Sequence, residues 1–512
     1  MEHNIGLFLT KRAHLNPGLE AFVGPRTGLR LTYAELNARS NRIANALRAL
    51  GVKKGERVAL LLMNGSEFVE SFFALAKIGA VVVPLNWRLV PDELAFILKD
   101  SGSETLIFGS DFNASATALR ALGDACPVRR WIHCGDNKPG FAEDYAALQA
   151  AASPEEPPIG AEDDDMLYIM YTSGTTGLPK GAMHSHNTAM WACITIFSTS
   201  EQRFKDRYII ALPLYHVGAL TPMTVNVYGG NTNIIMHAFD PLKTWKLIGE
   251  EKVTTMLAVP AMLQFMLQVP NREQFDISTL RWIMSGAAPV PVNLIHAYEK
   301  LGIEIHQVYG LTESCGPACL IGPDDALRKA GSTGKAFFHT QVRVVNEAGK
   351  DVKPGEPGEV IIRGRHNMLG YWGRPEATAQ TIREGWLYSG DVAVVDNDGF
   401  IFIQDRTKDM IISGGENVYP AEIENVILGH PKVVEVAVIG IPSAKWGESP
   451  LACVVRKDES LTAEEVIAHC KGKLAPFKTP KVVEFIDQVP RNPTGKMLKR
   501  VLRERFPIEA KE

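Results

Sequence analysis

A loop rich in glycine and hydroxyl residues carries the clearest chemical signal in this chain. Residues 171–181 read Tyr-Thr-Ser-Gly-Thr-Thr-Gly-Leu-Pro-Lys-Gly. Backbone N–H groups, hydroxyls and one lysine can together surround a polyphosphate, although the lysine lacks the Gly-Lys-Ser/Thr order of a Walker loop. An ordinary surface turn has the same composition, so the loop alone leaves both interpretations open. Its candidate phosphate contacts are Thr172, Ser173, Gly174, Thr175, Thr176 and Lys180.

The elements that must position this loop have the pattern of a parallel sheet covered by helices. Apolar and β-branched runs predict strands, and one run between two of them has helical periodicity, which makes a βαβ unit. The predicted strands are residues 57–62, 80–84, 166–171, 254–259, 280–284 and 303–309, with a helix at 67–78. Ligands of open α/β sheets bind beyond the carboxyl ends of strands. We therefore expect a nucleotide near Gly286 and Gly310.

The composition predicts a globular protein with more than one domain. The chain has 512 residues, 46% hydrophobic and 22% charged, which is more than one core usually holds. A net charge of −4 argues against a general nucleic-acid-binding function, which needs a basic surplus. Seven cysteines without CxxC pairs suit a reducing compartment, and the first residues do not resemble a signal peptide. We expect a cytoplasmic location.

The pattern changes near residue 405 to short elements that predict a small separate lobe. They are strands at 410–412, 433–441 and 451–455, a helix at 420–428 and a capping box from Thr462 to Glu465. A second capping box, Thr32 to Glu35, opens a helix near the N-terminus. The proline- and acid-rich segment 153–165 predicts a solvated connector ahead of the phosphate loop.

Seven motifs occur in an order that resembles the adenylate-forming superfamily: acyl-CoA synthetases, carrier-protein adenylation domains and beetle luciferases. The motifs are residues 171–181, 212–216, 285–289, 308–314, 388–391, 405–417 and 490–496. From Val308 onward the spacing resembles bacterial fatty acyl-CoA synthetases, including a mycobacterial very-long-chain type, and also feruloyl-CoA synthetases. The resemblance implies an α/β fold with a large N-terminal domain of βα-layered sheets, residues 1–407, and a small mobile α+β domain, residues 408–512.

The reaction of this family joins a carboxylate to AMP and then lets a thiol displace the AMP. Because the first step brings two anions together, charge neutralisation and positioning must dominate catalysis. The resemblance implies that Thr172 and Glu313 hold Mg²⁺, that Thr312 contacts the α-phosphate, and that Asp391 and Arg406 bind the ribose side. The other implied nucleotide contacts are Gly286, Ala287, Ala288, Gln307, Val308, Tyr309 and Gly310.

A lysine near the C-terminus resembles the family's mobile catalytic cation. Lys496 follows Pro-Thr-Gly, and by resemblance it enters the cleft only for adenylation. Lys408 matches the hinge about which the small domain rotates between the two steps. The implied catalytic residues are therefore Lys180, His216, Thr312, Glu313 and Lys496.

Two further sites follow from the resemblance. The implied CoA contacts are Arg88, Ser413, Gly414, Gly415, Trp446, Phe477 and Lys481. The implied acyl pocket comprises Thr195, His216, Val217, Gly218, Ala287, Ser314, Cys315 and Gly316, together with residues 258–263. His216 resembles a gate between pocket and thiol tunnel, and a core histidine is the alternative. The small, apolar lining argues against dicarboxylic acids.

Two other clusters have ordinary interpretations that we favour. The pair His184 and His186 lacks carboxylate or cysteine companions nearby in the sequence, so we do not predict a metal site there. The basic segment 203–207, with Lys11 and Arg12, is either a solvated loop, which is favoured, or a surface for weak peripheral contact with a membrane.

The sequence as a whole predicts an ATP-dependent acyl-CoA ligase with Mg²⁺ as cofactor and ATP, CoA and a carboxylic acid as substrates. A medium- or long-chain fatty acid is the first choice of acid, and a phenylpropanoid such as ferulate is the alternative. A module that loads a carrier protein, a luciferase-like oxidase and an inactive nucleotide-binding scaffold are the competing classes. The oligomeric state is left open, a homodimer included.

Overall fold

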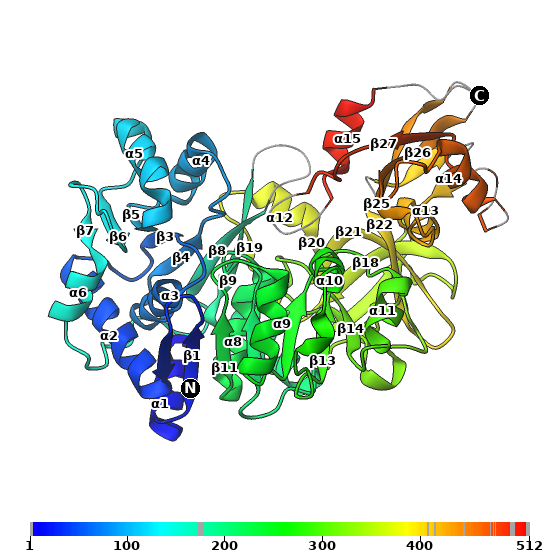
Figure 1. Cartoon of the computed structure of the whole chain (residues 1–512). Coiled ribbons are helices and arrows are strands. Elements are labelled where there is room, and N and C mark those ends of the chain that lie inside the picture. The colour runs from blue at the N-terminus through cyan, green and yellow to red at the C-terminus, as the bar shows by residue number, and fades with distance from the viewer. Residues whose placement is uncertain are drawn as a thin grey trace.

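The computed structural model describes residues 4–172, 179–406, 409–413, 416–443, 446–471, 473–474, 476, 478–491 and 497–507, and the side chains of 405, 406, 412, 416 and 417 are also outside the description. The described residues form a large N-terminal α/β part and a small C-terminal α+β part (Figure 1). The predicted fold class is confirmed. Within the described residues, no helix is long and apolar enough to cross a membrane.

The first large sheet has the order β16-β15-β14-β13-β12-β10-β11-β1-β2. Its central strands are parallel, and the strands on either end of it turn antiparallel. The strands are β1 Glu20–Gly24, β2 Leu29–Thr32, β10 Arg207–Ile210, β11 Thr232–Ile235, β12 Thr255–Ala258, β13 Trp282–Ser285, β14 Glu304–Tyr309, β15 Cys319–Leu320 and β16 Lys335–Ala336. The strands predicted before Gly286 and Gly310 are therefore present and parallel.

The second large sheet has the order β19-β9-β8-β4-β3-β5-β6-β7. It carries the phosphate loop between β8 and β9, which pair antiparallel. The strands are β3 Arg57–Leu61, β4 Val81–Pro84, β5 Thr105–Gly109, β6 Arg130–Cys134, β7 Glu143–Asp144, β8 Met166–Thr172, β9 Lys180–Ser185 and β19 Gly370–Tyr371. The predicted βαβ unit is β3, α3 and β4, with β3 and β4 parallel.

Helices fill the space between the two large sheets and cover their outer faces. Residues of α1, α2, α3, α7 and α8 share one apolar cluster with both sheets, α9 to α11 cover the outer face of the first sheet, and α4 and α5 that of the second. These helices are α1 Gly6–Leu15, α2 Tyr33–Ala49, α3 Ser66–Ile78, α4 Pro91–Ser101, α5 Asn113–Ala121, α6 Tyr145–Ala151, α7 His186–Thr199, α8 Val217–Gly229, α9 Pro241–Glu250, α10 Pro260–Leu267 and α11 Val292–Glu299. The layering is that of a helix-covered α/β protein.

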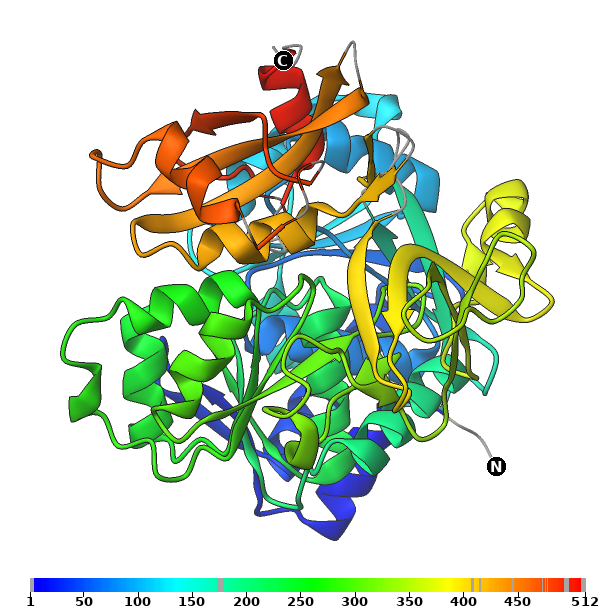
Figure 2. The ribbon, with the colours of Figure 1, turned by 90° about the vertical axis from the view of Figure 1, so that its right-hand side faces the viewer.

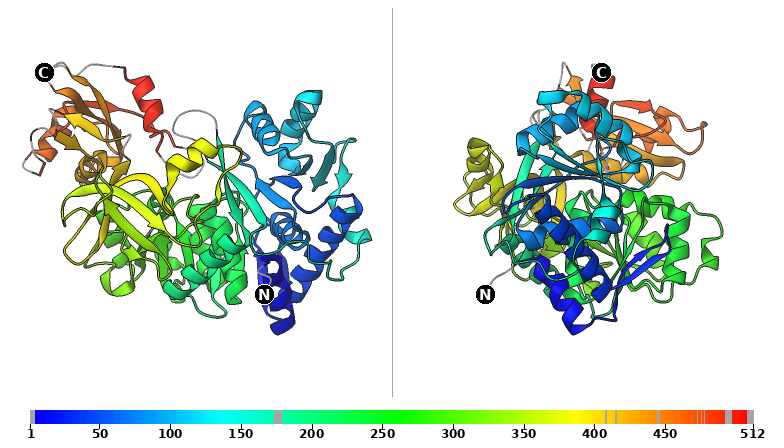
Figure 3. Two further views of the ribbon diagram at one scale, coloured as in Figure 1. Left: turned by 180° about the vertical axis from the view of Figure 1, so that it is seen from behind. Right: turned by 90° about the vertical axis from the view of Figure 1, so that its left-hand side faces the viewer.

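A third sheet completes the N-terminal part and a fourth forms the C-terminal part. The third is β17 Gln341–Val345, β18 Pro357–Arg363, β20 Ile382–Arg383, β21 Trp386–Val395 and β22 Ile401–Arg406, with α12 Pro375–Thr381. The fourth is β23 Ile411–Ser413, β24 Glu416–Val418, β25 Val433–Ser443, β26 Gly447–Arg456 and β27 Val482–Phe485, with α13 Pro420–Leu428, α14 Ala463–Cys470 and α15 Lys499–Arg505. The C-terminal part lies at one end of the N-terminal part (Figures 2 and 3), where Asn293 Nδ2 donates to the Leu428 carbonyl at 3.3 Å.

The two predicted capping boxes are confirmed. At Thr32 and at Thr462, the side chain accepts from the N–H three residues on, and that residue's glutamate accepts from the cap N–H. The domain boundary predicted at residue 408 stays a prediction, because residues 407 and 408 lie outside the described part of the chain.

The predicted solvated connector, 153–165, is more firmly held than its composition suggests. Lys77 is 2% exposed, and its ammonium donates to Glu156 at 2.8 Å and to Asn37 and Asn41 at 2.6 Å. A buried ammonium must be paired to offset its desolvation. The connector therefore supplies the carboxylate that allows α3 to bury a lysine against α2.

The N-terminal helix depends on a neutral histidine. The Ile5 N–H donates to His186 Nδ1 at 3.0 Å, so Nδ1 must be unprotonated. Burial lowers the pKa of His186 to about 4, below its ordinary value of 6.5. The unfolded chain takes up the proton first as the pH falls, so this group costs stability between pH 6.5 and about 4.

We expect the packing of α1 to weaken at mildly acidic pH because of His186. Within that pH range, each unit of acidification lowers the free energy of detaching α1 by about 1.4 kcal/mol per proton taken up. Hydrogen-exchange protection of α1, taken relative to α9, should fall between pH 7.5 and 5.5 in the wild type and stay level in His186→Gln, which does not titrate. A wild-type ratio that does not change with pH would contradict this account.

Candidate active site

Three parallel strands end together where the nucleotide was expected. Ala258, Ser285 and Gln307 are aligned across β12, β13 and β14. Gly286 follows the last residue of β13, and Gly310 follows the last residue of β14. A Cβ atom on Gly286 would lie 2.3 Å from the Val308 carbonyl oxygen, and one on Gly310 would lie 1.4 Å from that of Gly316. Only glycine fits at these two positions.

Two other residues at this edge adopt the left-handed backbone conformation without being glycine. They are Ala287, with φ of 66°, and Cys315, with φ of 57°. Such a conformation is costly for a side chain with a Cβ, and it persists where the surroundings enforce it, often at functional sites. Both lie within the nucleotide and acyl segments predicted from the sequence.

The backbone of residues 312–314 is held by three separate donors. His184 Nε2 donates to the Thr312 carbonyl at 2.8 Å, the Met368 N–H donates to that of Glu313 at 2.7 Å, and His366 Nδ1 donates to that of Ser314 at 2.9 Å. Consecutive carbonyls thus have partners on β9 and on the segment before β19. Sequence analysis missed all three donors and had treated His184 as incidental.

Burial keeps both of these histidines neutral. It lowers the pKa of His184 and of His366 to about 4. The Thr340 hydroxyl donates to His366 Nε2 at 2.8 Å, which leaves the proton on Nδ1 for the Ser314 carbonyl. The segment before Cys315 is therefore anchored without adding charge to the site.

The two charged residues expected near the phosphates, Lys180 and Glu313, both contact the side chain of Tyr371. The Tyr371 hydroxyl donates to Glu313 Oε1 at 2.8 Å, and Lys180 Nζ lies 5.3 Å from the centroid of the Tyr371 ring. Thr172 ends β8 opposite Lys180, and its hydroxyl donates to the Lys180 carbonyl at 3.4 Å. The structure thus brings together Thr172, Lys180 and Glu313, and it adds Tyr371, which no sequence signal had indicated.

The expected ribose-binding carboxylate is fixed by the end of β14. The Tyr309 hydroxyl donates to Asp391 Oδ2 at 2.7 Å, and both side chains are buried. Burial, and then the Asp391 charge, raise the pKa of Tyr309 well above its ordinary value. Arg406 is aligned with Asp391 across β21 and β22. Tyr309 orients the carboxylate, in addition to the nucleotide contact that was predicted for it.

His216, the predicted gate between the acyl and thiol sites, lies beside Tyr215. It precedes α8, and burial followed by the Arg88 charge lowers its pKa to about 3. Arg88 Nη1 donates to the Tyr215 hydroxyl at 3.0 Å, and the Tyr215 ring centroid lies 4.3 Å from that of His216, so both residues contact Tyr215. Among the described residues, the buried His216 Nε2 atom has no hydrogen-bond partner, as expected of a polar atom that faces a ligand position.

Part of the expected acyl pocket comes together around Cys315. Its thiol lies 3.0 Å from the Tyr168 hydroxyl, and its carbonyl accepts from Thr221 at 3.0 Å. A Cβ on Gly316 would approach Val217 to 3.7 Å, so the start of α8 faces this turn. Thr195 is fully buried on α7, and its hydroxyl has no hydrogen-bond partner within the part of the chain that the structure describes.

The residues expected to bind CoA in the C-terminal part are placed at one end of β23 and β26. Ser413 pairs with Gly447, and the Trp446 N–H donates to Ser443 at 3.0 Å. Lys481 is exposed, and its ammonium donates to the Pro476 carbonyl at 3.2 Å. The predicted residues outside the described part of the chain are Ser173, Gly174, Thr175, Thr176, Lys408, Gly414, Gly415, Phe477 and Lys496.

The donor set suits a Mg²⁺ ion that is shared with a nucleotide. Among the described residues, no group of three or more His, Cys, Asp or Glu side chains could hold a metal by itself. One carboxylate, Glu313, with the hydroxyl of Thr172, is the set that Mg²⁺ uses when phosphate oxygens and water complete its shell.

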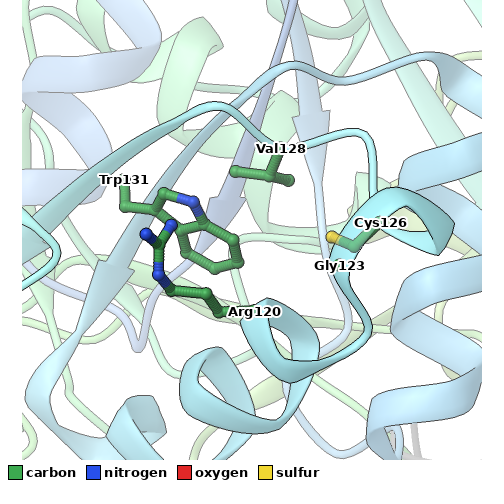
Figure 4. Close-up of a pocket in the computed structure, with 5 residues that line it drawn as sticks. All are labelled: Arg120, Gly123, Cys126, Val128 and Trp131. Atoms are coloured by element: carbon green, nitrogen blue, oxygen red, sulfur yellow. The ribbon is translucent and has the colours of Figure 1, made fainter.

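A pocket of about 270 Å³ lies elsewhere, beside β6 of the second sheet, and Figure 4 shows the residues that line it. It is lined by Arg120, Gly123, Cys126, Val128 and Trp131. In the strand order of this sheet, β5 and β6 lie toward one end, and β8 and β9 lie toward the other. The pocket is therefore separate from the site described above.

These features define an adenylate-forming enzyme, and the chain belongs to the AMP-binding enzyme family. The family model matches residues 9–372, and the AMP-binding enzyme C-terminal domain matches residues 422–496. The resemblance stated from the motifs is therefore confirmed.

Individual relatives are similar over the full length. The chain is 46% identical to the long-chain-fatty-acid–CoA ligase FadD13 of Mycobacterium tuberculosis over 98% of both chains. It is 40% identical to a feruloyl-CoA synthase of an Amycolatopsis species, over 98% of this chain and 99% of that one. The solved structure of a Mycobacterium tuberculosis fatty acyl CoA synthetase is 45% identical with a TM-score of 0.80, covering 99% of this chain and 98% of that one.

We expect Gly310→Ala to disrupt the site, because its Cβ would collide with the Gly316 carbonyl. Forcing a methyl group into a packed position costs about 1–3 kcal/mol. Thermal unfolding should shift down, and hydrogen exchange should rise in residues 310–316. Gly322→Ala is the matched control, since nothing lies within 4 Å of a Cβ there. Equal behaviour of the two variants would refute the steric argument.

Proposed function

We propose that this enzyme is an ATP-dependent ligase that activates a medium- or long-chain fatty acid as acyl-AMP and transfers the acyl group to CoA. The full-length similarity to a long-chain-fatty-acid–CoA ligase carries the proposal. The small and apolar residues Val217, Cys315 and Gly316, which lie together, support an apolar acyl chain over an acid with a second carboxylate.

The chemistry has two displacements. A carboxylate oxygen of the acid attacks the α-phosphorus of ATP, the bond from that phosphorus to the bridging oxygen breaks, and pyrophosphate leaves. The CoA sulfur then attacks the acyl carbon and loses its proton to solvent, while AMP departs with the electron pair of the broken bond. Both steps need charge neutralisation and alignment more than bond-making groups from the protein.

The described side chains supply those two needs. Lys180 faces the polyphosphate, Asp391 holds the ribose, and Glu313 with Thr172 would hold Mg²⁺. When bound, that ion neutralises the phosphate oxygens. His216 acts as a neutral, shape-defining group, because a histidine with a pKa of about 3 is a poor acceptor for a thiol proton.

The described residues on either side of Lys496 are held within the C-terminal part. Arg491 and Met497 form a β-bridge on either side of residues 492–496. Arg491 Nε donates to Glu435 at 2.9 Å, and Lys499 pairs with the buried Glu424 at 3.0 Å. Both ends of the segment that carries Lys496 are thus tied to β25 and α13. We propose that this lobe turns about Lys408, with Ser413 to Gly415 facing the pantetheine arm after the turn.

Feruloyl-type acids are the second candidate, because the chain is also 40% identical to a feruloyl-CoA synthase. Both candidates share the adenylation step and differ in the acid.

The basic cluster at 203–207 gives little support to membrane contact. Arg207 pairs with Glu20 at 2.7 Å, and Arg12 Nε donates to the Tyr228 carbonyl at 3.1 Å, so the favoured interpretation is a solvated loop.

Acid-dependent exchange of labelled pyrophosphate into ATP tests the proposed reaction. We expect exchange with fatty acids from octanoate to stearate, thioester formation when CoA is added, and a lower kcat/KM with ferulate. Replacing CoA with a holo carrier protein distinguishes the competing loading module. Absence of exchange with every acid offered would reject the proposal.

The two steps should respond differently to the two lysines of the C-terminal part. Lys496→Ala should slow adenylation by about 100-fold and spare thioester formation from supplied acyl-AMP. Lys408→Pro should slow the second step and spare the first, because proline stiffens the hinge. Lys246→Ala, at an exposed site on α9, is the control. Equal losses in both half-reactions for both variants would rule out the rotating lobe.

A further inference from the structure

We propose that Tyr371 is a positioning residue for adenylation, which orients the Glu313 carboxylate through its hydroxyl and holds the Lys180 ammonium over its ring. The inference rests on the proposed function and adds a residue that the motifs do not contain. The two contacts that carry the inference are the hydrogen bond from Tyr371 to Glu313 Oε1 at 2.8 Å and the contact of its ring with Lys180 Nζ at 5.3 Å.

The backbone of Tyr371 is fixed on both sides. On β19 it is aligned with Ala182 of β9, and Lys180 lies two residues from Ala182 on the same face of that strand. The Tyr371 N–H donates to Thr378 Oγ1 at 2.9 Å, and the Trp372 N–H donates to the Gly181 carbonyl at 2.8 Å. Tyr371 is 9% exposed and packs in one apolar cluster with Tyr309. Its side chain is therefore a rigid reference point.

The same segment also holds the backbone of the residue it orients. Met368 lies three residues before Tyr371, and its N–H donates to the Glu313 carbonyl at 2.7 Å. Both the main chain and the carboxylate of Glu313 are thus set from residues 368–371. Because the hydroxyl engages Oε1, the carboxylate has a defined rotation, and partners of this kind tune metal-binding carboxylates.

The ring also keeps two opposite charges from cancelling. Within the described residues, no ion pair joins Lys180 and Glu313, although both contact Tyr371. A direct pair would have to break before either group could bind phosphate or metal. Tyr371 offers the ammonium a π face and the carboxylate a neutral donor, so both groups keep their charge for the nucleotide.

Two substitutions separate these contacts. Tyr371→Phe removes the hydroxyl and keeps the ring, whereas Tyr371→Leu removes both. Calorimetric titration with ATP, once with Mg²⁺ and once with excess EDTA, reports the metal-dependent part of binding without acid or thiol. We expect Tyr371→Phe to weaken Mg²⁺–ATP binding about tenfold and to leave binding in EDTA within about twofold. We expect Tyr371→Leu to weaken both.

Tyr228→Phe, on α8 and far along the helix from His216, is the matched control, and melting temperatures verify that each variant is folded. Wild-type affinities for Tyr371→Phe, or equal losses with Mg²⁺ and EDTA, would overturn the role of Tyr371. If either of these outcomes occurs while the wild type shows acid-dependent pyrophosphate exchange, only the inference about Tyr371 is rejected. If the wild type shows no exchange, the proposed function itself fails.

Discussion

Hydrogen bonding of the consecutive carbonyls from Thr312 to Cys315 is the constraint on which the candidate site depends. His184, the Met368 N–H, His366 and Thr221 each donate to one of them. These donors come from different parts of the fold. A backbone whose every carbonyl is engaged cannot rotate without leaving a buried acceptor unpaired, which is expensive. The left-handed conformation of Cys315 is maintained in this way.

Sequence reasoning located the strand ends and the glycines because local pattern determines them. The approach of the Gly286 and Gly310 backbones to neighbouring carbonyls follows from parallel strands that end in glycine turns, and both features are visible in the chain. The donors around Glu313 could not be found in this way. Tyr371 contacts Lys180 only because β19 adds to β9, a pairing of two short strands far apart in the sequence. His366 stands in an irregular segment that has no periodicity.

The C-terminal part poses the same problem in another form. Apolar runs and a capping box predicted β23, β25, β26, α13 and the start of α14, since local signals determine them, but the short β24 and β27 and the helix α15 were not predicted. The ion pairs that tie it together join remote residues: Arg503 with Asp409 at 3.0 Å, and Lys499 with Glu424 at 3.0 Å. The first pair connects α15 to the residue that follows the predicted hinge. Residue 409 and the helix after Lys496 therefore belong to one packed unit, which is the arrangement that rotation about residue 408 would require.

Charged side chains that stabilise packing in this protein have different partners from those at the candidate site. Where a cation is buried for packing, it has a carboxylate partner: Lys77 with Glu156 at 2.8 Å and Lys499 with Glu424 at 3.0 Å. At the site, Lys180 contacts the neutral Tyr371 ring and Glu313 accepts from the Tyr371 hydroxyl. A paired charge is already compensated and gives little to a ligand. A charge that contacts only neutral groups keeps its full electrostatic field. The approach of a carboxylate to a phosphate needs such a field, because both groups are anions.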